Sequence, residues 1–580
     1  MPKIISKIKV VVIVVFLIAA AIMISYGLIY QLKPEGVSWT LSDFTDAFIE
    51  SAIGGDYLLL TDAPKEDMWL LGIGKILFKI AIVLIGLSGL DYFFNQHLTV
   101  FSFQLKSWFF RNKNNQHVLI LGVGDRGTAL ALKHIDAGEK VVGIEIDQQN
   151  QNIAELRNKG AVIIVGDAMD NKIINRLRPR RAQKIYVVCT SDSANMVITK
   201  NLLTSKSAAP NTDIVTAIES SEMRMFFRNR FTKDLKEKKV DLLPRLIGFR
   251  YQAALNIIKE QSKKLALKTQ VKEKGVHALI HASDDVRQDL IRAAVVMLQI
   301  SGHKTPSLCV SGSDEKDAQQ FNNYFPAAPI AVKLHWNSLM AKDAITQLGW
   351  EQADLALFAL DNDPQTLAQA ERFTKDFPNS IVIACLRDSG ELIQLLKGSE
   401  QKDSRLHIKS LYGLLEKNHN WHDDSIENDA IHINDTYYNN AIKNGKAEGK
   451  TIEEIKKKNS NLALWEDLPE HLRDSNRLAA QHNQIKKEIC KINPFNMDEK
   501  TLVDYLSRTE KFRWNAEKAM DGWRAPINDK ERKQIEAMKD GRNYDQLIHP
   551  SLVSYDELTK KDQHKDEAIV QIVREVLGKT

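Results

Sequence analysis

Short apolar runs recur in the middle of the chain, and each is followed by a stretch with helix-spaced apolar residues. The runs 118–121, 140–144 and 161–165 predict three strands with helices between them. Strands that alternate with helices are typical of a parallel sheet covered on both faces. Residues 116–260 are therefore predicted to form a Rossmann-like α/β domain, whose last strand is 213–218.

The same order of strand, loop and helix appears a second time. His277 follows His117 by 160 residues, and the predicted fourth strands, which begin at Ala182 and Ala353, are 171 residues apart. A constant order at a nearly constant offset indicates an internal repeat. We therefore predict a second, degenerate Rossmann-like domain over residues 271–415.

Two apolar segments precede these domains. Residues 10–30 form an uncharged run of 21 residues, enough to cross a hydrocarbon layer of ~30 Å at ~1.5 Å per residue. The alternative is a secretory signal, but the run is too long for the apolar part of one. A second segment, 69–94, contains Lys75 and Lys79. A lysine as deep as Lys79 favours a partner helix or an aqueous cavity over lipid.

Charge predicts how these segments are oriented. Residues 31–68, which lie between them, carry two lysines against eight acids. Six basic residues flank the other ends: Lys3, Lys7, Lys9, Lys106, Arg111 and Lys113. By the positive-inside rule, both termini are cytoplasmic, and the chain is a multi-pass protein of the cell inner (plasma) membrane with the lipid bilayer as a partner. The predicted segments are 1–33 for the first transmembrane helix, 34–68 for the extracytoplasmic acidic loop, and 69–115 for the second transmembrane helix and its connector.

The C-terminal third changes character. Residues 416–460 are polar with weak periodicity and are predicted to be a linker, whereas residues 461–580 are strongly helical and predict a small α-helical domain. The linker contains a cluster of possible ligands: His419, His422, Asp423 and Asp424. Two histidines three residues apart in a polar linker are usually solvated, so no metal site is predicted.

Composition limits the possible functions. A chain of 580 residues is too long for one core and predicts three or four domains. A net charge of +5 is near balance for this size and gives no argument for a nucleic-acid partner. The four cysteines share no metal-like spacing and indicate buried thiols in a reducing compartment.

The turn after the first predicted strand carries the clearest candidate chemistry. Gly122 permits a tight turn, Gly124 lets backbone approach a pyrophosphate, and Gly127 lets helix and strand pack closely. The pyrophosphate would bind the N–H groups of a helix that begins near Arg126. Glu145, 18 residues beyond Gly127, is placed to accept hydrogen bonds from a ribose diol, and it would repel a 2′-phosphate. The pattern predicts NAD(H) or another adenine nucleotide rather than NADP(H).

These residues also carry a family resemblance. The runs GVGDRGTALA, VVGIEID, GAVIIVGDAMD and IYVVCTSDSANM resemble the TrkA-N domain, also called RCK, which regulates potassium channels and transporters. The resemblance covers roughly residues 116–231. It implies that the GDA run lies near the adenosine, that 190–192 borders the nucleotide pocket, and that tandem domains assemble into a homo-oligomer, a dimer or tetramer. The candidate cofactor-binding residues are Gly122, Gly124, Asp125, Arg126, Gly127, Glu145, Asp147, Gly166, Asp167, Ala168, Thr190 and Asp192.

The second repeat lacks this turn. Ala282-Ser283-Asp284-Asp285 stand where the glycines would be. Side chains there block the approach of backbone to a pyrophosphate, and two acids repel it. We therefore predict that the second domain binds no dinucleotide.

The C-terminal region resembles the RyR domain, the small helical repeat named for ryanodine receptors, over about residues 502–577. The matching positions are Trp514, Gly522, Trp523, His549, Pro550, Leu552, Tyr555 and Leu558. Bacterial members often have histidine where this chain has Lys511. The tryptophans are core residues or, together with nearby arginines, they form a second nucleotide sensor, because guanidinium groups grip phosphates and stack on bases. The RyR ligand candidates are Arg473, Arg477, Arg513, Trp514, Trp523 and Arg524.

Two spans, a short loop and nucleotide domains match the layout of a two-span potassium channel. Residues 52–56 read AIGGD where a potassium filter would read like TVGYGD, so a ring of filter carbonyls is not supported. We predict a ligand-gated, ion-channel-like assembly that nucleotide binding regulates, with a poorly selective or anion-favouring current. The alternative is a membrane effector of bacterial nucleotide signalling or phage defence, with the RyR domain as sensor. No Ser/His/Asp or Cys/His arrangement stands out, so no enzyme is predicted.

Overall fold

The computed structural model describes residues 117–204, 212–227, 244–387, 405–411, 424–458, 462–538 and 541–578, with five isolated positions near the N-terminus. Apart from those five positions, the predicted transmembrane helices and the acidic loop lie outside the described residues. Within the part that is described, no helix is both long enough and apolar enough to cross a membrane. The chain divides into two compact units, Met1–Asn115 and Gln116–Thr580, and every element below belongs to the second unit.

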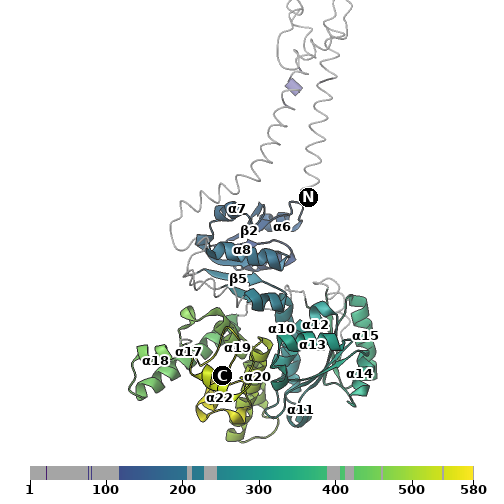
Figure 1. The fold of residues 1–580 in the computed structure, drawn as a ribbon. Coiled ribbons are helices and arrows are strands. Elements are labelled where there is room, and N and C mark those ends of the chain that lie inside the picture. Colours follow the sequence, from purple (N-terminus) through teal and green to yellow (C-terminus); the bar gives the residue numbers. More distant parts are fainter. Residues whose placement is uncertain are drawn as a thin grey trace, which may run out of the picture. The chain divides into compact units, whose positions relative to one another are not determined.

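The first sheet has six parallel strands in the order β3-β2-β1-β4-β5-β6. They are β1 (His117–Leu121), β2 (Val141–Glu145), β3 (Val162–Val165), β4 (Ala182–Val187), β5 (Asp213–Ala217) and β6 (Arg245–Ile247). The helices between them are α5 (Asp125–Asp136), α6 (Asn152–Asn158), α7 (Asn171–Arg176) and α8 (Asp192–Thr204). The strand order reverses between β3 and β4, so right-handed connections put α5 and α6 on one face and α7 and α8 on the other. Figure 1 labels α6, α7 and α8 around this sheet.

The prediction that 213–218 is the last strand of this domain is wrong, because β6 adds a further strand at the edge of the sheet, beside β5. β6 has three residues, too few for a period-two pattern to be visible in the sequence. This short strand leads the chain directly into the long helix α10 (Phe249–Leu265), so it connects the first sheet to the second domain.

The second sheet repeats the first. Its order is β12-β11-β10-β7-β8-β9, again all parallel, so the internal repeat predicted from the constant offset is confirmed. The strands are β7 (His277–Ala282), β8 (Ser307–Ser311), β9 (Lys333–Asn337), β10 (Leu355–Ala359), β11 (Ile381–Leu386) and β12 (Leu406–Ser410). The helices are α11 (Thr269–Lys274), α12 (Asp284–Met297), α13 (Glu315–Tyr324), α14 (Ala341–Gln347) and α15 (Asp363–Asp376).

Both faces of the second sheet are buried, and neighbouring residues on its strands enter different cores. Leu279 and Cys309 pack with the residues of α14 and α15. Ile280 and Val310, one position further along, pack with α10 and α12. Side chains alternate across a strand, so a sheet covered on both sides needs apolar residues at every position. This requirement explains why these strands appear in the sequence as continuous apolar runs.

The C-terminal helices are α17 (Asp424–Ala447), α18 (Ile452–Lys458), α19 (Glu470–Ile492), α20 (Glu499–Met520), α21 (Asp529–Glu536) and α22 (Lys560–Gly578). The stretch predicted as a polar linker, 416–460, differs from that expectation, because from Asp424 onward it forms α17 and α18. Ile426, Ala430 and Ile433 of α17 pack against α19. The apolar positions follow helical spacing, but the many polar residues between them hide the pattern in the sequence.

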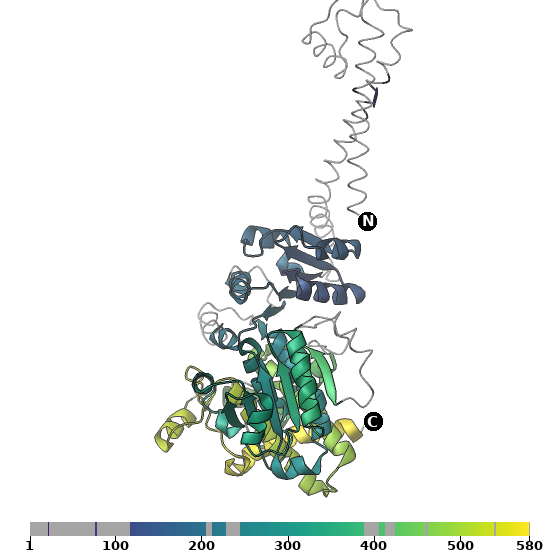
Figure 2. The ribbon, with the colours of Figure 1, turned by 90° about the vertical axis from the view of Figure 1, so that its right-hand side faces the viewer.

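The C-terminal helices share a core with the second Rossmann-like domain, and Figure 2 shows them against it. Tyr505 of α20 is 1 % exposed and donates its hydroxyl to the carbonyl oxygen of Ile300 at 3.0 Å. Gly302 lies under its ring, where an added Cβ would come within 2.6 Å of Tyr505 Cδ2. Ile485 and Leu506 are buried in the same cluster. The helical region is therefore docked by an apolar interface and not merely attached by a chain link.

Candidate nucleotide-binding site

Two of the three glycines in the first turn are required by the fold itself. Gly122 follows β1 with φ of +99°, and a Cβ there would lie 2.8 Å from the backbone nitrogen of Cys189. A Cβ on Gly127 would lie 1.9 Å from the carbonyl oxygen of Gly122. The first glycine thus makes the turn, and the last lets α5 pack against it, as the sequence predicts.

Gly124 differs from its neighbours because the protein leaves space beside it. It is the N-cap of α5 with an ordinary negative φ, and a Cβ there would meet no described atom within 4 Å. Among the described residues, no side chain caps this helix end. The N–H groups of the first turn of α5 are therefore available to an anion that approaches along Gly124.

Glu145 lies beside this turn but also has a structural role. It is 8 % exposed, and its Oε2 accepts the backbone N–H of Val123 at 2.9 Å. Its Oε1 accepts the backbone N–H of Asp147 at 3.0 Å. Each carboxylate oxygen has a further lone pair, so the side chain can hold the turn and still accept a ribose hydroxyl.

The GDA run lies next to Glu145, because β2 and β3 are paired and the Gly166 N–H donates to the Glu145 carbonyl oxygen at 2.8 Å. Ala168 is buried, while Asp147 and Asp167 each accept a backbone N–H two residues further on, at 2.8 Å. These bonds hold the two loops at the carboxyl ends of neighbouring strands. The structure thus brings together the predicted residues of the first three strands.

The fourth-strand candidates serve another purpose. Both carboxylate oxygens of Asp192 accept backbone N–H groups, from Glu219 at 2.8 Å and from Ser220 at 2.9 Å. Asp192 thus ties α8 to the segment after β5, while Thr190 is exposed, three residues beyond the end of β4. Asn195, which sequence reasoning missed, is 1 % exposed and bonds the carbonyls of Cys189 and Ala217. It joins the ends of β4 and β5; the run IYVVCTSDSANM contains it, but no role was predicted for it from the sequence.

Arg126 is held by a second residue that sequence reasoning missed. Its Nη1 lies 2.6 Å from Glu219 Oε1, and its guanidinium group stacks 5.0 Å from the ring of Phe249. Glu219 also accepts the backbone N–H groups of Phe249 and Arg250 at the start of α10. The nucleotide turn is therefore linked to the helix that leads into the second domain.

The corresponding turn of the second domain is filled by protein side chains. Arg387 donates to Asp285 Oδ1 at 2.5 Å and Oδ2 at 2.9 Å, and to Ser283 Oγ at 2.8 Å. Asp284 is exposed and pairs with Arg287 at 2.8 Å. The two acids that replace the glycines are thus already paired with arginines of this chain. They would also repel a pyrophosphate.

The RyR ligand candidates do not form one site. Arg473 and Arg477 stack near Trp465, at 5.7 and 5.5 Å from its ring, and pair with acids of the helical region. Arg524 pairs with Glu531. Each of these arginines is thus paired with acidic side chains of the helical region itself.

Arg513 is 1 % exposed and belongs to a buried ionic network on α20. It donates to Glu510 Oε1 at 2.7 Å and to Glu517 Oε2 at 2.6 Å, and Lys486 pairs with the other oxygen of Glu510 at 2.5 Å. Burial favours the neutral carboxyl, but Arg513 and Lys486 outweigh it and hold the pKa of Glu510 below its usual value. The guanidinium group of Arg513 is thus engaged by buried carboxylates of the protein itself.

The motif residues around His549 do come together. Its imidazole is in edge contact with Trp514 at 4.9 Å and with Trp523 at 5.9 Å. Lys511 lies 4.2 Å from the Trp514 ring and donates to the Ser551 carbonyl oxygen at 2.6 Å; burial lowers the pKa of this lysine to about 8. Trp523 is 7 % exposed, which supports the core interpretation of that tryptophan.

No group of histidine, cysteine and acidic side chains suited to a metal ion occurs among the residues that the structure describes. The predicted linker residues His419, His422 and Asp423 lie outside those residues. All four cysteines are free, two buried and two partly buried.

Comparison with known proteins is consistent with this geometry. Residues 118–233 match the TrkA-N domain, which confirms the resemblance seen in the first domain. Potassium channel protein 1 of Methanocaldococcus jannaschii is 26 % identical over 190 residues, which cover 32 % of this chain and 54 % of that protein. The match thus spans about half the length of this curated relative.

Two solved structures are also similar in part. GsuK bound to ADP is 15 % identical, with a TM-score of 0.32 over 71 % of this chain and 96 % of that one. The GsuK channel bound to NAD is 13 % identical, with a TM-score of 0.33, and the match covers 70 % of this chain and 81 % of that one. Scores this low support no argument about ligand or assembly. What the comparisons establish is that the first of the two Rossmann-like domains is of the TrkA-N type.

Proposed function

We propose that the first Rossmann-like domain binds NAD(H) or another adenine nucleotide, and that this binding regulates an ion-transporting, potassium channel-like assembly in a membrane. The observation that carries the proposal is the open helix end at Gly124, between two glycines that the fold requires and beside Glu145. Such a turn has backbone donors for a pyrophosphate and an acid for a ribose.

The role is regulation rather than catalysis. A nucleotide would act by binding two arrangements of the cytosolic domains with different affinity, and the linkage from Arg126 through Glu219 to α10 gives the turn a route to the second domain. The apolar segments 10–30 and 69–94 would cross the bilayer, with both termini cytoplasmic, and the assembly would be a homo-oligomer. The helical region, with Trp514 and Trp523 against His549, would be an RyR-type module.

Titration calorimetry on the full-length protein tests the nucleotide site with NAD, NADH, ATP and ADP. The full chain is needed because a fragment that ends at residue 260 would cut α10. Gly124→Ala is the informative variant. The protein itself has space for the added methyl group, but this group would collide with a bound pyrophosphate. We expect at least about tenfold weaker binding, with a free energy of unfolding within about 0.5 kcal/mol of wild type.

Thermal unfolding of the same variant is the control for its fold. Absence of binding by all four nucleotides at millimolar concentration would contradict the proposal. Unchanged affinity in Gly124→Ala would show that a nucleotide binds elsewhere.

A further inference from the structure

Arg126 is the only cation among the twelve candidate residues of the nucleotide site, whereas five of those residues are acids. Asp125 precedes it in the first turn of α5 and is exposed, and Glu145 ends β2 beside the same turn. A pyrophosphate adds further negative charge at this place, so its binding depends on a cation that offsets these carboxylates. The position of the Arg126 side chain therefore matters for any ligand that carries a phosphate.

The guanidinium group of Arg126 has one engaged nitrogen and two accessible ones. Its Nη1 lies 2.6 Å from Glu219 Oε1, and its carbon lies 5.0 Å from the centre of the Phe249 ring. Among the described residues, Nε and Nη2 have no hydrogen-bond partner, and neither atom is fully buried, since the side chain is 23 % exposed. Side chains lean toward the N-terminus of their helix, so the second residue of α5 places these donors near the helix end that receives a pyrophosphate.

Glu219, which holds Arg126, is itself fixed by contacts with two helices. Its backbone N–H donates to Asp192 Oδ1 at 2.8 Å, and this bond ties it to α8. Its carboxylate accepts the backbone N–H groups of Phe249 at 3.3 Å and of Arg250 at 3.2 Å. The N-cap of α10 is Gly248, which has no side chain, so Glu219 supplies the missing cap. A carboxylate fixed in this way holds the arginine in one orientation.

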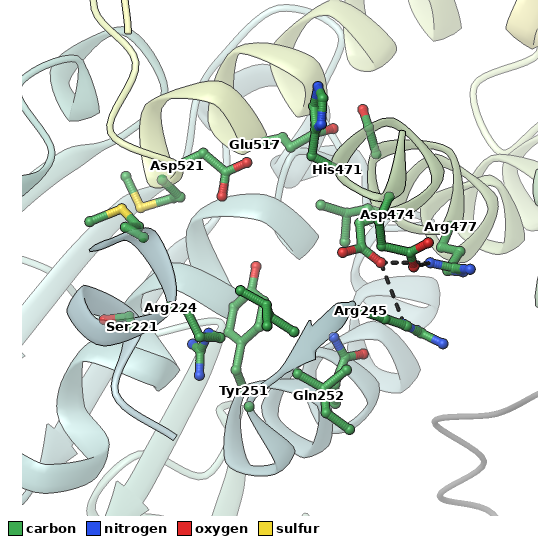
Figure 3. A pocket seen from close by; sticks show the side chains of 18 of the residues that line it. Ser221, Arg224, Arg245, Tyr251, Gln252, His471, Asp474, Arg477, Glu517 and Asp521 are labelled. Atoms are coloured by element: carbon green, nitrogen blue, oxygen red, sulfur yellow. Dashed lines mark hydrogen bonds and ion pairs between the residues drawn. The ribbon is translucent and has the colours of Figure 1, made fainter. Parts of the chain in front are cut away.

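The first turn of α10 also faces the other parts of the chain. The ring of Tyr251 lies 5.8 Å from the guanidinium carbon of Arg224 and 4.8 Å from that of Arg292 on α12. A cavity of about 140 Å³ lies between α10 and the helices α19 and α20, and the Tyr251 hydroxyl points into it (Figure 3). The helical region thus leaves this turn incompletely packed, and the position of the turn depends in part on Glu219.

We propose that Glu219 is a positioning residue of the nucleotide site, which holds Arg126 by Nη1 so that Nε and Nη2 bind a phosphate oxygen of the nucleotide. This role rests on the proposed function, because it needs a nucleotide whose phosphates lie at the end of α5. The arginine then joins two anionic groups, the phosphate and the carboxylate that caps α10. Each group stabilises the other through it, and occupancy of the site is linked to the first turn of α10.

The sign of one substitution separates this role from a simple effect of charge. An acid near a phosphate repels it, so a Glu219 that acted by its charge alone would weaken binding, and its removal would strengthen binding. A Glu219 that positions Arg126 has the opposite effect, and its removal weakens binding. Glu219→Gln keeps the size of the side chain but loses the charge that holds the guanidinium group.

Calorimetry with ADP on the purified full-length protein measures this sign. We expect Glu219→Gln to weaken ADP binding about tenfold, and Arg126→Met to weaken it at least as much. The double variant should bind ADP no more weakly than Arg126→Met alone, because Glu219 acts through the arginine. Glu222→Gln is the matched control. It removes an acid of the same segment, one that accepts hydrogen bonds from Ser220 and Ser221, and it should leave ADP binding unchanged.

Hydrogen exchange gives a readout at α10 itself. ADP should slow exchange of the Phe249 and Arg250 amides in the wild-type protein, and it should slow this exchange less in Arg126→Met at equal occupancy of the site. Glu219→Asp is a second variant should Glu219→Gln fail to fold. It keeps the charge but is one methylene too short for the 2.6 Å contact, so it too should weaken ADP binding.

Two kinds of failure can be told apart. If the wild-type protein binds no nucleotide, the proposed function falls together with the role of Glu219. If the wild-type protein binds ADP, the role of Glu219 alone is overturned by unchanged or tighter binding in Glu219→Gln, or by additive losses in the double variant.

Discussion

The two Rossmann-like domains have the same strand order but differ in the turn after the first strand. In the first domain, the two residues Gly122 and Val123 separate β1 from the N-cap Gly124. In the second, the N-cap Ser283 follows β7 directly. The shorter turn leaves no room for backbone to curve around a pyrophosphate. The apolar strands thus determine the strand order, which the two domains share. Whether a domain can bind a pyrophosphate depends on a few residues outside the strands.

The two turns also satisfy their polar groups differently. Gly127 brings α5 against the Gly122 carbonyl by having no side chain. In the second domain, Arg287 is 8 % exposed and donates to the carbonyl oxygens of Ala282 and Gly312 and to Asp317. The second turn is completed by the protein's own cations, whereas among the described residues no side chain caps the helix end of the first.

Arg287→Met should have the largest effect. It leaves the Ala282 and Gly312 carbonyls and Asp317 without their buried cation, and we expect the second domain to lose about 3–5 kcal/mol of its free energy of unfolding. Urea denaturation measures the loss. Arg372→Met, which changes an exposed arginine on α15, is the control. Equal losses in the two variants would show that Arg287 does not hold this turn.

Glu145→Ala should weaken nucleotide binding by about 1–3 kcal/mol, because the ribose loses its acceptor. The structure adds a second effect, since the N–H groups of Val123 and Asp147 also lose their acceptor. We therefore expect the unfolding temperature to fall as well. Glu145→Gln keeps an acceptor and should retain most of the stability but less of the affinity. Wild-type affinity in both variants would remove Glu145 from the site.

His117 at the start of β1 should make the first domain sensitive to acid. Burial lowers its pKa to about 4, below the value near 6.5 of an exposed histidine. Between these values the unfolded chain binds more protons, so stability is lost as pH falls from 6.5 toward 4, by about 1 kcal/mol at pH 5.5. His117→Phe should reduce this dependence, and His134, whose pKa burial also lowers, should account for part of what remains in the first domain. His277→Phe, at the corresponding but more exposed position of the second domain, should change it less.

Arg387→Ala should have the smallest effect. It removes a partly exposed pair with Asp285, worth about 0–1 kcal/mol. Even without the arginine, Asp284, Asp285 and the short turn oppose a pyrophosphate, so no nucleotide site should appear. Calorimetry compares the double variant Gly124→Ala/Arg387→Ala with Gly124→Ala alone, because binding to the first site is weakened equally in both. Nucleotide binding that appears with Arg387→Ala would show that the arginine alone blocks the second turn.

The sequence predicts the sheets well because their strands are buried on both faces. A continuous apolar run such as 118–121 can be recognised as a buried strand from its length alone. The turn that follows can be recognised because two of its glycines are sterically required. Side chains whose partners are distant in sequence could not be found this way. Glu219 and Asn195 act through residues far from them along the chain, and neither type nor spacing marks them.

The helical region shows the same limit. Charged residues such as Arg513 and Lys486 resemble solvated or ligand-binding groups in the sequence, yet they are buried against one another. A buried ion pair cannot be distinguished from two surface charges until the fold brings the partners together. In 424–447, the many polar residues likewise obscure the helical pattern in the sequence. The helix packs through only three buried residues, Ile426, Ala430 and Ile433.

The core that α20 shares with α12 has a consequence for synthesis of the protein. On the ribosome, Tyr505 is made 208 residues after Met297, although both are buried in the same cluster. At ~5–20 residues per second, this separation is about 10–40 s. During that time α12 has emerged with α10, which precedes it, but without α20, which covers another part of its apolar surface. The second Rossmann-like domain therefore cannot complete this shared core until α20 has been translated.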